Sequence, residues 1–133
     1  MLKNLLLAAL LFISANAFSQ SFTSIWNTNN TSVDSPVNNE VTIPTNPAYT
    51  SYNYTIEWGD GASDNNVTGD ITHTYAAPGT YTISISGDFP AIYFNDEDTG
   101  DKLKIIEITN WGTIQWQTME NENGEIISKL LPE

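Results

Sequence analysis

The chain has 133 residues, enough for one domain with a modest hydrophobic core. It contains no cysteine, which excludes thiolate catalysis, disulfide bonds and cysteine-based metal sites. Sixteen Asp and Glu residues against four Lys give a formal net charge of −12. Such a surface repels phosphate backbones and anionic lipids, so we expect neither nucleic acid nor a charged membrane surface as a partner.

The first segment, residues 1–19, is predicted to be a secretory signal peptide. Lys3 supplies the positive start, Leu5–Ile13 is an uninterrupted apolar run, and residues 15–17 form a small-x-small cleavage site. Cleavage after this triplet and cleavage after Ser19 both fit the sequence. The apolar run is about half the length that a transmembrane helix needs. We therefore expect a secreted or cell-surface protein with no transmembrane anchor in the mature chain.

The rest of the sequence is typical of an all-β domain, because short runs alternate apolar and polar residues with turn signals between most of them. Asn27–Asn39 and the polar stretch between Gly61 and Ile71 are predicted to be loops. The predicted strands, in chain order, are Phe18–Trp26, Glu40–Ile43, Tyr52–Trp58, Ile71–Tyr75, Thr80–Ser86, Ala91–Phe94, Lys102–Ile108 and Thr113–Thr118.

Two turns follow from local chemistry. After Trp58, the run Gly59-Asp60-Gly61 combines glycines that permit positive φ with a short carboxylate that can accept hydrogen bonds from backbone N–H groups. Further along, residues 76–79 end in Pro-Gly, the usual chemistry of a tight turn. This second turn predicts that Ile71–Tyr75 and Thr80–Ser86 form a hairpin.

Three motifs in this order resemble the signature of the PKD (polycystic kidney disease) domain. They are W-G-D-G at residues 58–61, H-T-Y at 73–75 and P-G-T-Y-T at 78–82. The resemblance covers about Phe22–Ser86 and implies an immunoglobulin-like antiparallel β-sandwich of the kind common in extracellular proteins. The family usually has W-x-F-G-D-G, whereas Trp58 directly precedes Gly59 here. The positions that carry the signature, and that the resemblance implies are structural, are Trp58, Gly59, Asp60, Gly61, His73, Tyr75, Pro78, Gly79 and Tyr81.

A weaker resemblance involves Ser86–Phe94, Ile106–Ile108 and Trp111–Trp116. These segments are similar to the region that leads into BspA-type leucine-rich repeats in bacterial surface proteins. The expected organisation is a signal peptide at 1–19, a PKD-like β-sandwich at 20–95, and a strand extension and tail at 96–133. A truncated repeat-domain start is one interpretation of that last segment, and its end fits either a terminal hairpin or a helical turn.

Catalysis is not expected. His73 is the only histidine, so any imidazole chemistry would require it, and no G-x-S-x-G nucleophile elbow accompanies it. The resemblance also implies a structural role at this position. We therefore predict that the protein is not an enzyme.

The acidic run at residues 96–101 has two interpretations. One is a polar tip between two strands; the other is a weak Ca²⁺ site with Asp96, Asp98 and Asp101 as ligands, because Ca²⁺ binds closely spaced carboxylates. An EF-hand loop is excluded, since Asp101 stands where that loop requires glycine and a predicted strand follows. No other cofactor is expected.

Trp111 and Trp116 are the candidate binding residues. Exposed tryptophans can stack on sugar rings or anchor a protein partner, and the alternative is packing in the core. The expected function is therefore a secreted or cell-surface, non-enzymatic PKD-like module that binds a protein or a carbohydrate in adhesion. The alternative is a Ca²⁺-stabilised structural spacer left from a truncated repeat-containing surface protein.

Overall fold

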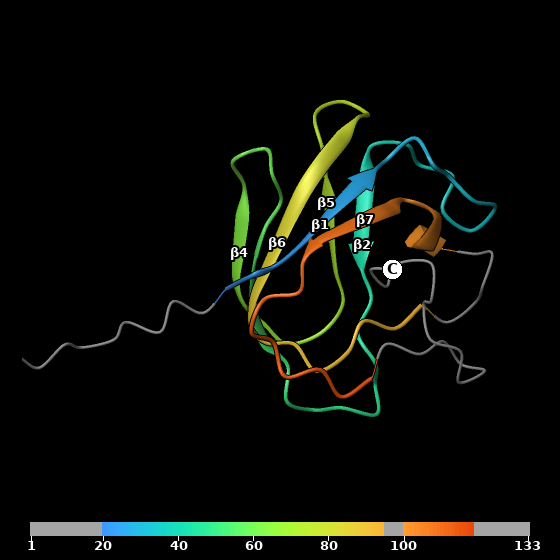
Figure 1. The fold of residues 1–133 in the computed structure, drawn as a ribbon. Helices are drawn as coiled ribbons and strands as arrows, with labels where there is room; N and C mark the ends of the chain where they lie inside the picture. The colour runs from blue at the N-terminus through green and yellow to red at the C-terminus, as the bar shows by residue number, and fades with distance from the viewer. Residues whose placement is uncertain (1–19, 95–99, 119–133) are drawn as a thin grey trace, which may run out of the picture.

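The computed structural model describes residues 20–94 and 100–118, and the regular elements of this part of the chain are antiparallel β-strands apart from one short 3₁₀ helix (Figure 1). The all-β prediction is therefore confirmed. The elements are β1 (Phe22–Asn27), β2 (Glu40–Ile43), β3 (Asn53–Glu57), β4 (Ser63–Val67), β5 (Ile71–Thr74), β6 (Thr80–Asp88), the 3₁₀ helix η1 (Gly100–Leu103) and β7 (Ile105–Asn110).

The described strands form two sheets. Five strands lie in the order β4-β3-β6-β1-β7, and β2 pairs with β5 in a separate two-stranded sheet. In the larger sheet, β6 pairs with both β3 and β1. β7 lies in the segment expected as an extension, yet it pairs with β1 and so belongs to the same sheet as the signature strands.

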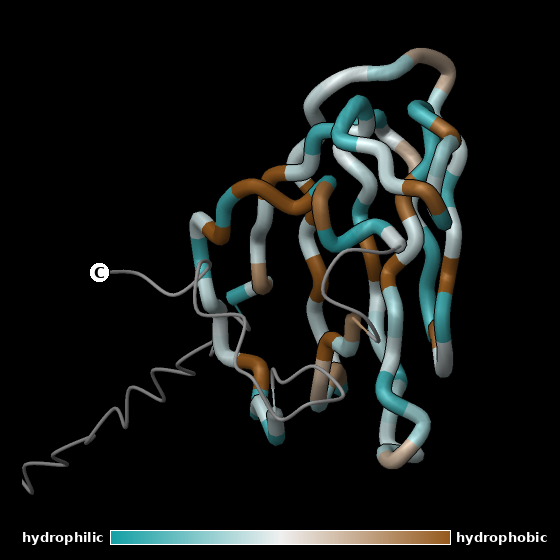
Figure 2. Tube along the Cα trace, turned by 90° about the vertical axis from the view of Figure 1, so that its right-hand side faces the viewer, coloured by the Kyte–Doolittle hydropathy of each residue, from teal (hydrophilic) through white to brown (hydrophobic). Residues whose placement is uncertain are grey.

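One hydrophobic core joins the two sheets. Alternate residues of β1, β2 and β3 are buried, as β1 shows with Phe22, Ser24 and Trp26. Figure 2 shows this alternation as brown segments separated by paler and teal ones along the strands. The smaller sheet contributes Val41 and Ile43 to the same cluster. Burying each large apolar side chain contributes about 1.5–3 kcal/mol, which is how a chain without disulfides holds together.

The polar stretch between Gly61 and Ile71 was predicted to be a loop, and this prediction is wrong. It contains β4, which pairs with β3 at the edge of the larger sheet. β4 has no apolar alternation because nearly all of its residues are exposed, so it gives no periodic signal. Asn66 has a φ of +55°, and the register with β3 shifts beside it.

The predicted hairpin between Ile71–Tyr75 and Thr80–Ser86 is also wrong. β5 pairs with β2, with Val41 opposite His73, whereas β6 pairs with β3 and β1. The turn at residues 76–79 therefore carries the chain from one sheet to the other. Turn chemistry fixes a change of direction but does not determine which strand becomes the neighbour.

Three further predicted strands are corrected. In Lys102–Ile108, the first residues form η1, because Lys104 N donates to Asp101 O at 2.9 Å, and the strand starts only at Ile105. Ala91–Phe94 and Thr113–Thr118 form no ladder and meet through a single bridge between Ala91 and Thr118. Their apolar residues pack against the core without strand pairing, so burial alone produced the alternating pattern.

Replacement of Trp58 tests the core. Its side chain is fully buried, and its Nε1 donates to Asp64 at 2.8 Å. We expect Trp58→Ala to lower the free energy of unfolding by about 3–5 kcal/mol, measured by urea denaturation. The control Val33→Ala, at a position that is 92% exposed, should change it by less than about 0.5 kcal/mol. Equal stability of the two variants would contradict the assignment of Trp58 to the core.

Candidate functional site

Three of the signature residues, Trp58, Asp60 and Tyr75, contact the ring of His73. This imidazole stacks on Trp58 with ring centroids 4.8 Å apart and planes 13° apart, and it meets Tyr75 edge-on at 4.6 Å. Its Nε2 lies 2.8 Å from Asp60 Oδ2. The side chain is only 17% exposed, and its three neighbours come from the turn after β3 and from the residue that follows β5.

The same cluster continues through two tyrosines. Tyr75 OH donates to Trp58 O at 2.9 Å, and its ring stacks on Tyr81 with centroids 3.6 Å apart. Burial raises the pKa of the Tyr75 phenol, which stays protonated and keeps donating. Tyr81 OH in turn donates to Ala77 O at 2.7 Å. Both tyrosine hydroxyls of the cluster therefore donate to backbone carbonyls of the fold itself.

Gly59 and Asp60 shape the turn beside this cluster. Gly59 has a φ of +83°, and a Cβ there would meet Thr82 O at 2.4 Å, so only glycine fits. Asp60 Oδ1 accepts a hydrogen bond from Ala62 N at 3.0 Å, while its other oxygen faces His73. The carboxylate therefore fixes both its own turn and the imidazole.

Asp60 is expected to make the free energy of unfolding depend on pH in the acidic range. The hydrogen bond with His73, followed by the one from Ala62 N, holds the pKa of Asp60 below its usual value. A depressed folded-state pKa stabilises the protein above the unfolded-state pKa, and this stabilisation disappears as the pH falls through the folded value. We therefore expect the urea midpoint to fall on acidification below about pH 4, with a shallower fall in Asp60→Asn.

The control for this measurement is Asp88→Asn, at an exposed carboxylate of β6. It should retain the acid dependence of the wild-type protein. An Asp60→Asn variant with the wild-type acid dependence would show that Asp60 does not contribute to it.

A second polar cluster is buried around Lys104. Its Nζ lies 2.7 Å from Asp101 Oδ1 and donates to Ser35 Oγ, Val37 O and Glu40 O at 2.8–3.0 Å. Asp101 also accepts hydrogen bonds from Ser35 Oγ and from the backbone N–H of Thr42. The pair ties η1 to the loop before β2, and its charges are compensated within the protein.

This geometry bears on the predicted calcium site. Asp101 is buried and bound to Lys104, whereas Asp96 and Asp98 lie outside the described residues. Within residues 20–94 and 100–118, no group of three or more His, Asp or Glu side chains is arranged to hold a metal ion. Calcium binding by this acidic run stays a prediction.

Replacement of Asp101 tests its role as the partner of Lys104. We expect Asp101→Asn to lower the free energy of unfolding by about 3–5 kcal/mol, because it leaves a buried ammonium group without a counter-charge. The measurement is urea denaturation in buffer with a metal chelator, which removes any contribution from calcium. Wild-type stability of Asp101→Asn in chelator would contradict this role.

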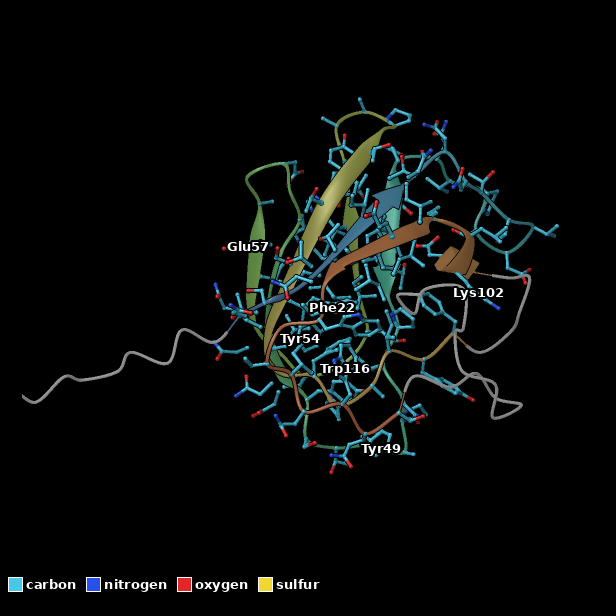
Figure 3. The ribbon with its side chains drawn as sticks, in the orientation of Figure 1. Phe22, Tyr49, Tyr54, Glu57, Lys102 and Trp116 are labelled. Atoms are coloured by element: carbon cyan, nitrogen blue, oxygen red, sulfur yellow. The ribbon has the colours of Figure 1, made fainter. Side chains whose placement is uncertain are left out.

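Trp111 and Trp116 are brought together, half-buried, at one end of the larger sheet. Trp116 packs edge-on against Phe22 with centroids 5.0 Å apart, and it contacts Trp111 at 6.2 Å and Phe89 at 5.9 Å. Figure 3 shows Trp116 in the lower half of the fold, below Phe22, with Tyr49 lower still. Both tryptophans thus pack against the core and do not form a fully exposed stacking platform.

A cleft of about 570 Å³ lies beside these tryptophans, and we call it the glutamine cleft. The side chains that matter for its chemistry are those of Tyr49, Ser51, Asp88, Thr113, Gln115 and Gln117. Sequence reasoning missed this site. Gln115 and Gln117 alternate with Trp116, which was a signal that they face away from the core, but nothing in the sequence places Tyr49 in the same cleft.

A second cleft, of about 520 Å³, lies between β2, η1 and the loop that precedes β2, and we call it the acidic cleft. Its walls include Asp34, Asp70, Tyr93 and Asp101. Asp70 accepts hydrogen bonds from the backbone N and the Oγ1 of Thr45, at 2.7 and 2.6 Å. Two of its three carboxylates are therefore already engaged inside the protein.

Comparisons with known proteins leave the family open. No family model, no curated protein and no solved structure matches the chain. Among the described residues, no helix is long and apolar enough to cross a membrane. The resemblance to the PKD domain therefore stays a prediction.

Proposed function

We propose that the chain is a secreted or cell-surface PKD-like module, with an immunoglobulin-like sandwich fold, that binds a protein or carbohydrate partner and has no catalytic role. The two-sheet arrangement and the clustering of the signature residues around Trp58 and His73 support the fold part of this proposal. The predicted signal peptide at residues 1–19 supports export.

The observation that carries the proposal is that the potentially reactive side chains of His73 and Lys104 are engaged in contacts within the fold. His73 is enclosed by Trp58, Tyr75 and Asp60, and Lys104 is fully buried against Asp101. Each of these groups makes contacts that hold the fold, so none is presented to a substrate as a nucleophile or a general base would be. The two clefts are instead open surfaces lined by hydroxyl, amide, carboxylate and aromatic groups.

The alternative of a calcium-stabilised spacer has less support. Its described ligand, Asp101, already has a buried ammonium group as counter-charge. A metal ion would have to compete with Lys104 for the same carboxylate.

The proposal is tested by binding to whole cells. We expect the purified, labelled protein to bind in a saturable way to cells or extracellular matrix from its own environment, and heat-unfolded protein not to bind. Pre-treatment of the cells with protease removes a protein partner, whereas periodate, which cleaves vicinal diols, removes a glycan partner. Each outcome therefore names the class of partner.

Enzyme assays can contradict the proposal. A hydrolytic activity that is lost in His73→Ala, in a variant shown to be folded, together with no saturable binding, would overturn the proposal. Folding of the variant is checked by its near-ultraviolet circular dichroism, since His73 stacks directly on Trp58.

A further inference from the structure

We infer that the glutamine cleft binds a neutral sugar unit of a glycan, with Gln115, Gln117 and Asp88 binding its hydroxyls and Tyr49 lying against its ring. This inference rests on the proposed function and names both the site and the chemical class of the ligand. The cleft volume of about 570 Å³ lies in the range of about 300–1,000 Å³ that is usual for small-molecule sites.

The charge of the cleft favours a neutral ligand. Asp88 is the only charged side chain among the described residues that line it. An anionic ligand would meet this carboxylate with no lysine to compensate, on a chain of net charge −12. A small cation would find a single carboxylate, fewer than the acidic cleft offers.

The polar groups of the cleft match a polyol. A side-chain amide has both donors and an acceptor, so Gln115 and Gln117 can each bind a hydroxyl that itself both donates and accepts. Asp88 adds acceptors, and Ser51 adds a hydroxyl. The phenol ring of Tyr49, which packs partly on the core, supplies an apolar surface for the C–H face of a sugar.

The walls of the cleft are fixed before any ligand binds. Gln117 N donates to Pro90 O at 2.7 Å, and the indole between the two glutamines is wedged against Phe22 and Phe89. The Gln115 amide donates to Thr113 O at 3.3 Å. Elsewhere in the lining, Tyr49 N donates to Asn46 O at 3.0 Å. A site whose walls are already ordered loses little conformational entropy on binding.

Gly87 fixes the position of Asp88. It has a φ of +97°, and a Cβ there would lie 2.8 Å from Asn53 O, so β6 can approach β3 this closely only with glycine. The next residue, Asp88, pairs with Asn53 of β3, and its carboxylate lines the cleft.

The test is affinity electrophoresis of the purified protein in gels that contain one polysaccharide each. The neutral probes are mannan, galactan, mixed-linkage β-glucan and amylopectin, and the anionic probe is polygalacturonate. We expect at least one neutral polysaccharide to retard the protein and polygalacturonate not to do so. Tyr49→Ala and the double variant Gln115→Ala/Gln117→Ala should each weaken this retardation by about tenfold.

Matched controls are Tyr93→Ala, a half-buried tyrosine of the acidic cleft, and Asn38→Ala, an exposed amide in the loop before β2. Both should keep wild-type retardation. The double glutamine variant changes only exposed side chains, so its loss of binding would not reflect unfolding. Thermal unfolding of each variant verifies this.

Three outcomes would overturn the inference: no retardation by any neutral probe, stronger retardation by polygalacturonate, or wild-type retardation of both cleft variants. The cell-binding assay distinguishes failure of the sugar inference from failure of the proposed binding function. If cell binding survives periodate and is lost after protease treatment, the proposed binding function stands and the inference of a sugar ligand is overturned. No saturable binding in either assay would reject both.

Discussion

The two sheets are held together at Trp58. This residue directly follows β3 of the larger sheet, yet its ring lies on His73 of the smaller sheet and its carbonyl accepts the hydroxyl of Tyr75. A buried indole loses a hydrogen bond to water, and Asp64 of the edge strand restores it. One side chain therefore connects three strands, and the position of the imidazole, the tyrosine pair and the turn at Asp60 all depend on it.

Lys104 imposes the second constraint, at the other side of the fold. An ammonium group that is fully buried must be surrounded by acceptors, and it finds them in Asp101 and in the segment from Ser35 to Glu40. A loop rich in Asn, Ser and Thr, whose Val33 and Val37 are exposed, is thereby attached to the core through polar contacts. The cost of desolvating the charge is offset by the ion pair with Asp101 and by the hydrogen bonds to Ser35, Val37 and Glu40, and these contacts also order the loop.

The sequence predicted those strands in which buried and exposed residues alternate regularly. β2, β3, β5 and β6 were located closely, because a buried residue such as Ile56 or Ile83 alternates with polar neighbours. β4 was missed because strand pairing alone orders an exposed polar segment, and the partner of β5 was wrong because a turn does not specify sheet neighbours. The glutamine cleft could not be foreseen, since its walls come from segments more than sixty residues apart, around Tyr49 and Gln115.

The polar edge strand has a consequence for how copies of the protein meet one another. β4 presents exposed Ser, Asp and Asn residues, and its register shifts near the left-handed Asn66. A flat apolar edge would serve as a template for strands of neighbouring copies, whereas a charged and irregular edge does not. The β4 edge of the larger sheet is therefore a poor template for the strands of a neighbouring copy.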